Sequence, residues 1–258
     1  MEARSDGAIA AWLAVLERRH LADRTLPEVR RALQALSGWY VERRGARGEL
    51  SRDAPFAGAG KRAAYALFYG PLHLLTVGRI VDALGATEPP PRAIFDLGCG
   101  TGAAAAAWAL AIPGAPPRIA GVDENAWAVE EARLTWRTLG LDARARRGSL
   151  VAERLPGAGA AIVLAYAVNE LRPDERDRLL DRLLDAGARG ARILVVEPLA
   201  RRVTPWWDGW VEAFRGTGGR ADTWRFPIDL PEPVRTLDRA AGLDHRELTA
   251  RSLYARGR

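Results

Sequence analysis

A short apolar stretch that runs directly into three closely spaced glycines constrains the fold of this chain more than any other feature. Residues 93–97 read Ala-Ile-Phe-Asp-Leu, which is typical of a buried strand, and Gly98, Gly100 and Gly102 follow. Glycine can adopt positive φ, and without Cβ it lets a ligand approach main-chain N–H groups closely. The alanine run that starts at Ala103 favours a helix packed close to a sheet. The sequence therefore predicts a strand, a ligand-binding turn and a helix in succession.

Strands and helices alternate from residue 92 onward, which is the pattern of a parallel sheet with helical crossovers. We expect strands over residues 93–97, 118–122, 143–147, 160–165 and 192–197. We expect helices over residues 125–139, 174–186, 203–214 and 234–241, and a further strand over 247–254. The predicted fold class is α/β, with a Rossmann-like, doubly wound and mostly parallel sheet. The order of the final strands does not follow from the pattern.

The N-terminal third of the chain has helical rather than strand periodicity. Ile9, Trp12, Leu13 and Leu16 follow the spacing that places apolar residues on one helix face. A second helix begins with a capping box at residues 25–28, and a third begins near residue 61 and is broken or bent at residues 70–71. A loop is expected over residues 43–60. We therefore expect a helical N-terminal cap over residues 1–88 and a ligand-binding domain over 89–258.

Composition limits the partners that the chain can have. Apolar runs stay well short of 20 residues and the N-terminus is polar, so we expect no membrane partner and a cytoplasmic location. Cys99 is the single cysteine and the three histidines are scattered, so no metal site is expected. The net charge of +6 is compatible with RNA, although the preference for arginine over lysine also fits a GC-rich genome.

Two ligand classes use a turn of this kind. Gly98-x-Gly100-x-x-Ala103 fits a loosened dinucleotide fingerprint, and Asp123 lies near the spacing expected for its ribose-binding acid. Asp96, however, completes the pattern Asp-x-Gly-x-Gly-x-Gly, which resembles motif I of the class I S-adenosylmethionine (SAM) methyltransferases. A carboxylate at that position would repel a diphosphate. The resemblance implies that SAM is the cofactor and that residues 89–258 bind it.

In a doubly wound sheet the ligand lies across the C-terminal ends of the strands. By the resemblance, Asp96 to Gly102 hold the methionine part of SAM, and Asp123 accepts hydrogen bonds from the ribose hydroxyls. Ser149 stands where the family often has an acid at the adenine amino group, so the adenine contact stays open, with Leu150 able to pack on the ring. The residues expected at the cofactor are Asp96, Gly98, Cys99, Gly100, Thr101, Gly102, Asp123, Glu124, Asn125, Ser149, Leu150 and Ala165.

The segment after the fourth strand should lie nearest the transferable methyl group. Methyl transfer is an in-line displacement at an activated carbon, so the enzyme must position the acceptor and remove any proton that it carries. The expected catalytic residues are Tyr166, Asn169 and Glu170, although Asn169 and Glu170 could instead only cap a helix. The expected substrate or lid residues are Tyr65, Tyr69, His73 and Glu197, of which the aromatic ones could instead only pack.

Three further segments resemble the Rsm22-type ribosomal small-subunit methyltransferase-like family. They are Ala64-Tyr65 within the helical region, Ala-Val-Asn-Glu-Leu at 167–171 and Val-Val-Glu-Pro at 195–198. The resemblance implies an association with small-subunit ribosomal RNA or its assembly. Many members carry a C-terminal cysteine cluster, which this chain lacks. We therefore expect a methyltransferase for an N or O nucleophile with RNA or the ribosome slightly favoured, while a small-molecule methyltransferase and a non-catalytic assembly factor remain alternatives.

Overall fold

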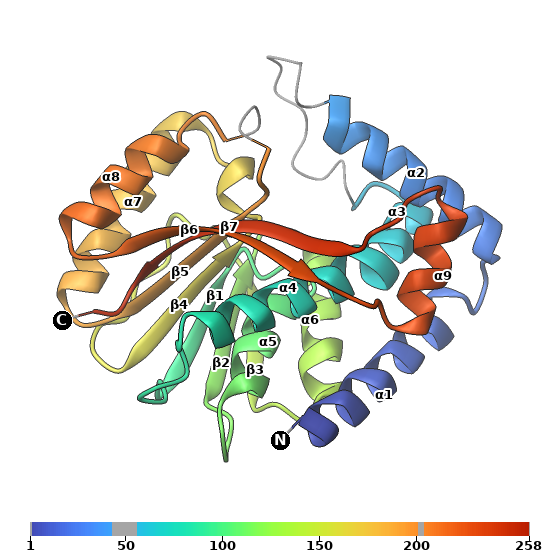
Figure 1. Ribbon diagram of the computed structural model, residues 1–258, viewed down its shortest axis with the longest axis horizontal. Helices are drawn as coiled ribbons and strands as arrows, with labels where there is room; N and C mark the ends of the chain where they lie inside the picture. Colours follow the sequence, from blue (N-terminus) through green and yellow to red (C-terminus); the bar gives the residue numbers. More distant parts are fainter. Residues whose placement is uncertain (1, 43–55, 201–203, 258) are drawn as a thin grey trace.

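A single seven-stranded sheet forms the centre of the computed structural model, which describes residues 2–42, 56–200 and 204–257 (Figure 1). The strands are β1 Ala93–Leu97, β2 Arg118–Asp123, β3 Ala143–Arg147, β4 Ala160–Ala165, β5 Arg192–Glu197, β6 Arg220–Pro227 and β7 Glu247–Ala255. The five strands predicted between residues 93 and 197 are confirmed, with bounds that agree to within one residue. The strand predicted over 247–254 is confirmed as β7.

The strand order is β3-β2-β1-β4-β5-β7-β6, with β1 to β5 parallel and β7 antiparallel to both of its neighbours. The sequence did not predict β6. It is an edge strand that pairs only with β7, and its side chains are at most half-buried, so it lacks the apolar signal of the inner strands. The chain adds β2 and β3 on one side of β1 and then crosses to add β4 and β5 on the other side. The position between β1 and β4 is the switch point, where doubly wound sheets bind ligands.

Helices cover both faces of the sheet (Figure 1). The helices that follow the strands are α5 Ala103–Ala111, α6 Ala126–Thr138, α7 Pro173–Ala188, α8 Trp207–Gly216 and α9 Glu232–Ala240, with a 3-10 turn, η3, at Val168–Glu170. Alternate side chains of one strand enter different clusters: Val163 of β4 packs with α4 and α5, whereas Leu164 packs with α7 and α8. Burial on both faces explains why β4 and β5 are almost continuously apolar. The helix expected from residue 203 begins at Trp207, and residue 203 lies outside the described residues.

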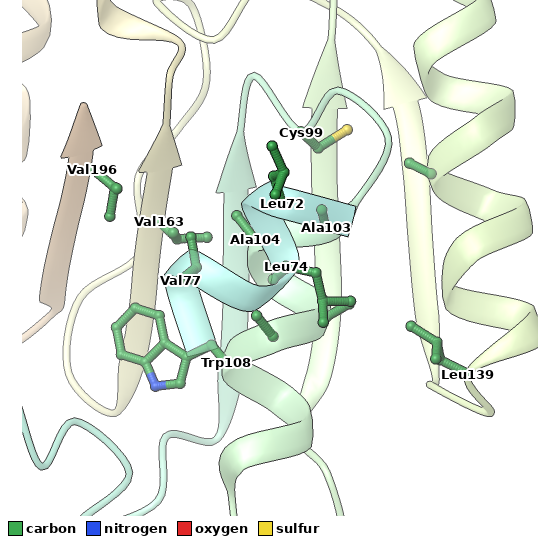
Figure 2. Packing of buried hydrophobic residues seen from close by; sticks show 14 of the residues in the cluster. Leu72, Leu74, Val77, Cys99, Ala103, Ala104, Trp108, Leu139, Val163 and Val196 are labelled. Atoms are coloured by element: carbon green, nitrogen blue, oxygen red, sulfur yellow. The ribbon is translucent and has the colours of Figure 1, made fainter. Parts of the chain in front are cut away.

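The N-terminal helices share a hydrophobic cluster with the sheet. They are α1 Glu2–His20, α2 Leu26–Glu42, α3 Ala59–Ala64, a π-helical turn η2 Tyr65–Tyr69, and α4 Gly70–Ala83. Leu72 and Val77 of α4 belong to the same buried cluster as Trp108 of α5 (Figure 2). On α1, Trp12 Nε1 donates to Thr135 Oγ1 of α6 at 3.2 Å. The helical segment is therefore anchored to the sheet domain, and its division from that domain at residue 88 stays a prediction. Residues 43–55 of the expected loop lie outside the described residues.

The expected bend at Gly70-Pro71 takes a different form. The chain stays helical from residue 59 to 83, and the change of geometry precedes the proline, in the π turn over 65–69. Proline has no N–H, and its ring clashes with the carbonyl four residues earlier in an α-helix. The π turn lengthens the hydrogen-bonded loop, so that the Gly70 N–H donates to the Tyr65 carbonyl. The proline is thereby accommodated without a break. In the part of the chain that the structure describes, no helix is both long and apolar enough to cross a membrane.

Candidate functional site

The turn after β1 adopts a conformation that requires glycine. Gly98, Gly100 and Gly102 have φ values of 73°, 51° and 79°. A Cβ on Gly98 would lie 2.7 Å from the Cβ of Ala167, and one on Gly102 would lie 2.7 Å from Trp136 Nε1. A Cβ on Gly100 would meet only the Tyr65 hydroxyl, at 3.8 Å. Gly98 and Gly102 therefore allow tight packing, whereas Gly100 leaves open space above the main chain.

That open space belongs to a cavity of about 260 Å³ at the carboxyl ends of β1, β2 and β4. Ten residues expected from the sequence line it: Tyr65, Gly98, Gly100, Asp123, Glu124, Asn125, Leu150, Ala165, Tyr166 and Glu170. Four lining residues were missed by the sequence reasoning: Phe56, Arg147, Ala167 and Leu171. Nine expected residues do not line it: Tyr69, His73, Asp96, Cys99, Thr101, Gly102, Ser149, Asn169 and Glu197.

Some of the missed residues carried a usable signal. Arg147 is the last residue of β3, and Ala167 and Leu171 flank the predicted positions after β4, so their places at strand ends could have indicated them. Phe56 had no such signal, because it stands in a segment rich in glycine, arginine and proline. Its ring contacts Tyr65 at a centroid distance of 4.9 Å, which brings it to the cavity.

Asp123, at the end of β2, connects the glycine turn to the next helix. Its Oδ2 accepts from the Gly100 N–H at 2.9 Å, and its Oδ1 accepts from the Asn125 N–H at 2.8 Å. The Asn125 side chain in turn caps α6 by accepting from the Trp127 and Ala128 N–H groups at 3.0 and 3.2 Å. The carboxylate is therefore fixed at the cavity wall by main-chain donors on both sides.

Asp96 and Cys99 lie behind the turn rather than in the cavity. Asp96 is buried and accepts from the Ala105 N–H of α5 at 3.1 Å. Burial, together with the nearby charge of Asp123, raises the pKa of Asp96 to about 7. Burial also raises the pKa of the Cys99 thiol, which therefore stays protonated. Asp96 thus holds the start of α5 beneath the turn.

Tyr166 follows β4 and carries the one non-glycine positive φ among the described residues, 59°. Its N–H donates to the Val196 carbonyl at 2.8 Å, its ring stacks on His73 at 4.0 Å, and its hydroxyl is hydrogen-bonded to Thr76. Burial raises the pKa of Tyr166, so the phenol stays neutral. Strained backbone of this kind persists only where the surroundings hold it, and it clusters at functional sites.

Glu197, at the end of β5, organises the segment that follows Tyr166. The Val168 N–H donates to Glu197 Oε1 at 3.0 Å, and the Asn169 side-chain amide donates to Glu197 Oε2. Trp206 Nε1 donates to Asn169 Oδ1 at 3.3 Å. Burial raises the pKa of Glu197 to about 8. The Asn169 side chain is therefore engaged within the fold, while the short 3-10 turn directs Glu170 to the cavity wall.

Tyr65, Tyr69 and His73 recur every four residues and form an aromatic row along the N-terminal helices. Their ring centroids lie 5.6 to 6.2 Å apart, and each side chain is half-buried. Burial raises the pKa of Tyr69 to about 12 and lowers the pKa of His73 to about 3, so both side chains are neutral at physiological pH. Tyr65 reaches the cavity wall, whereas His73 supports the ring of Tyr166.

A second, larger depression of about 710 Å³ lies at the opposite end of β4, against α7. Two of its three lining arginines, Arg182 and Arg189, donate to the main-chain carbonyls of residues 151, 153 and 155 and so hold that loop. It contains neither the glycine turn nor a carboxyl end of a strand. No group of three or more metal-ligating side chains occurs within residues 2–42, 56–200 and 204–257.

Comparisons with known proteins agree with this geometry. Residues 94–190 match the family model described as a methyltransferase domain. Among solved structures, mitomycin 7-O-methyltransferase is 18% identical with a TM-score of 0.52, over 96% of this chain and 73% of that chain. A protein from Nostoc punctiforme with a provisional O-methyltransferase assignment is 15% identical with a TM-score of 0.54, over 92% and 71%. A search of curated proteins gave no match.

The two solved structures share the fold of this chain over more than nine-tenths of its length. The matched family region extends from β1 through α7 and contains the glycine turn, Asp123 and the segment after β4. The comparisons do not support the Rsm22-type resemblance. Residues 94–190 thus match a methyltransferase domain, and the chain shares its fold with solved methyltransferases, which together support a SAM-dependent methyltransferase enzyme.

Proposed function

We propose that SAM lies across the ends of β1, β2 and β4, with its methionine part over the glycine turn and its ribose at Asp123. Three features support this fit. The missing Cβ of Gly100 leaves room directly above the main chain, the Asp123 carboxylate is held at the wall, and Leu150 provides an apolar surface for the adenine. Ser149 does not line the cavity, so Leu150 is the better of the two adenine contacts.

Bound SAM supplies a methyl group that its sulfonium already activates. The work left to the chain is to position the acceptor, to exclude water and to accept a proton. We assign positioning to the rings of Tyr65 and Tyr166 and proton acceptance to Glu170, the carboxylate on the cavity wall after β4. Asn169 and Glu197 act indirectly in this proposal, because they hold the turn that carries Glu170.

The composition of the cavity wall favours a small molecule as the methyl acceptor. The wall includes three carboxylates, those of Asp123, Glu124 and Glu170, and one described cation, Arg147. Arg147 Nε donates to the Glu124 carbonyl at 2.9 Å. A narrow cavity of aromatic and acidic side chains disfavours a phosphate backbone, whose binding depends on neutralisation by lysine and arginine. This charge balance is the observation that carries the proposal.

RNA is the second candidate, and the arginines of the edge strand β3 favour it. Arg144 and Arg146 are exposed on that strand, which ends at Arg147 beside the cavity, and the net charge of the chain is +6. Arg146 pairs with Glu153, which reduces its availability to phosphate. This candidate also retains the link to the ribosome that the sequence resemblance implied.

One labelling experiment separates these candidates. The full chain is incubated with methyl-labelled SAM and with the small-molecule, protein and RNA fractions of a lysate of the source cells. We expect label in the small-molecule fraction. Label in RNA would establish the second candidate instead, provided that the affinity for RNA falls steeply as the salt concentration rises and also falls in the variant Arg144→Ala. Binding of SAM without label in any fraction would support a non-catalytic assembly factor.

A further inference from the structure

The acceptor end of the cavity is lined by aromatic side chains from two distant segments. Tyr65 comes from the π turn of the N-terminal helices and Tyr166 from the end of β4. The hydroxyl of Tyr166 is hydrogen-bonded to Thr76, and His73 stacks against its ring at 4.0 Å. What Tyr166 offers a ligand is therefore the rest of its ring, held in one orientation by its neighbours and by its strained backbone.

Two carboxylates of the cavity wall act on the ring of Tyr65. Burial, followed by the charges of Asp123 and Glu170, raises the pKa of Tyr65, so both carboxylates act on the same phenol. Asp123 lies on the cofactor side, at the end of β2, whereas Glu170 lies on the acceptor side, after β4. Among the described residues of the wall, Arg147 is the single cation, and it lies at the end of β3 beyond Asp123.

We infer that the methyl acceptor is an amine that binds as its ammonium form, beside the carboxylate of Glu170 and against the rings of Tyr65 and Tyr166. This inference rests on the proposed function. A cation gains from the faces of aromatic rings and from a charge-assisted hydrogen bond to a carboxylate. A neutral alcohol gains neither interaction to the same degree, and a phenolate or phosphate is repelled by Glu170. The wall therefore selects an acceptor by charge.

The reaction balances on the residues present. The ammonium gives one proton to the Glu170 carboxylate, which leaves a lone pair on nitrogen. That lone pair forms the new N–C bond to the methyl carbon, while the C–S bond breaks and its electron pair returns to sulfur. The products are a methylated ammonium, a neutral thioether and a protonated Glu170, which then releases its proton to solvent. No oxidant, metal or further reactant takes part.

The test measures binding rather than turnover. The full chain is saturated with S-adenosylhomocysteine, and calorimetry then compares phenethylammonium with 2-phenylethanol, which shares its ring and chain length. We expect the amine to bind at least about tenfold more tightly than the alcohol. Equal affinities, or no binding of the amine while S-adenosylhomocysteine binds normally, would overturn the inference. Failure of S-adenosylhomocysteine itself to bind would instead remove the proposed function.

Matched variants localise the effect. Glu170→Gln keeps the side-chain shape and should reduce the preference for the amine to about twofold or less, with unchanged affinity for S-adenosylhomocysteine. Glu212→Gln removes an equal charge from an exposed position on α8 and should keep the full preference. Tyr65→Leu should weaken amine binding by roughly fivefold. A full preference in Glu170→Gln would place the ammonium elsewhere and refute the assignment.

Discussion

The two ends of the cavity are built in different ways. At the cofactor end, hydrogen bonds join main-chain groups of the glycine turn to a carboxylate at the end of the neighbouring strand β2. All of these groups lie within residues 96–125. At the acceptor end, Tyr65 and Tyr166 come from segments far apart in the chain, and both rings pack against His73. The cofactor end is thus a local property of the sequence, whereas the acceptor end exists only once the N-terminal helices dock.

The largest effect is expected at the cofactor end, from Gly98→Ala. Its Cβ would lie 2.7 Å from Ala167 at a φ of 73°, so overpacking and left-handed strain add to about 3 kcal/mol or more. We expect SAM affinity to fall by at least about 100-fold, measured by calorimetry.

Gly114→Ala is the matched control for that change. Gly114 also has positive φ, 88°, but a Cβ there would meet no atom within 4 Å. The variant should lose only about 1 kcal/mol of unfolding free energy and keep its SAM affinity. Equal SAM affinity in the two variants would show that the turn does not define the cofactor end.

A smaller loss is expected from Asp123→Ala. The variant removes the acceptor for the Gly100 and Asn125 N–H groups and the proposed ribose contact. We expect SAM to bind roughly 30- to 100-fold more weakly, the value of one or two charge-assisted hydrogen bonds. Asp142→Ala, an exposed carboxylate that pairs with Arg118, should leave the affinity unchanged. Affinity within twofold of the original would refute the ribose assignment.

The smallest effect concerns the acceptor end, through the titration of Glu197. Burial raises its pKa from 4.5 to about 8, so its protonated form stabilises the fold below pH 4.5, and that stabilisation is lost as pH rises through 8. Glu197→Gln cannot titrate. The unfolding free energy of the original chain, relative to that of this variant, should therefore fall by roughly 2 kcal/mol between pH 6 and 8.

Urea unfolding of both proteins at the two pH values measures this difference. Glu247→Gln provides the control, because Glu247 is exposed and pairs with Arg225 at the edge of the sheet. Its difference from the original chain should change little with pH. A constant difference for Glu197→Gln would mean that the carboxyl is already ionised beneath the acceptor end.

The same contrast explains what the sequence could predict. The inner strands and the glycine turn follow from local composition, because burial on two faces requires continuous apolar runs and positive φ requires glycine. Asp123 could be placed for the same reason, as the residue that ends a strand. The role of Asn169 could not, because its amide is engaged by Glu197 and Trp206, which follow it in the chain by many residues.

Two other features needed the structure itself. The half-buried edge strand β6 has no periodic signal of its own, since its burial depends on β7 and α8. The stacking of His73 on Tyr166 joins a helix to the end of a distant strand, and nothing in either segment specifies the other. Such contacts are set by the tertiary packing of the N-terminal helices on α5.

The most direct test of the account is a calorimetric titration of the full chain with SAM, S-adenosylhomocysteine and NAD. The cofactor end combines a glycine turn with two carboxylates, Asp96 behind it and Asp123 at its wall, so it should accept a sulfonium nucleoside and reject a diphosphate. We expect the first two ligands to bind one per chain and NAD to give no heat of binding. Tight binding of NAD, with none of SAM, would contradict the account.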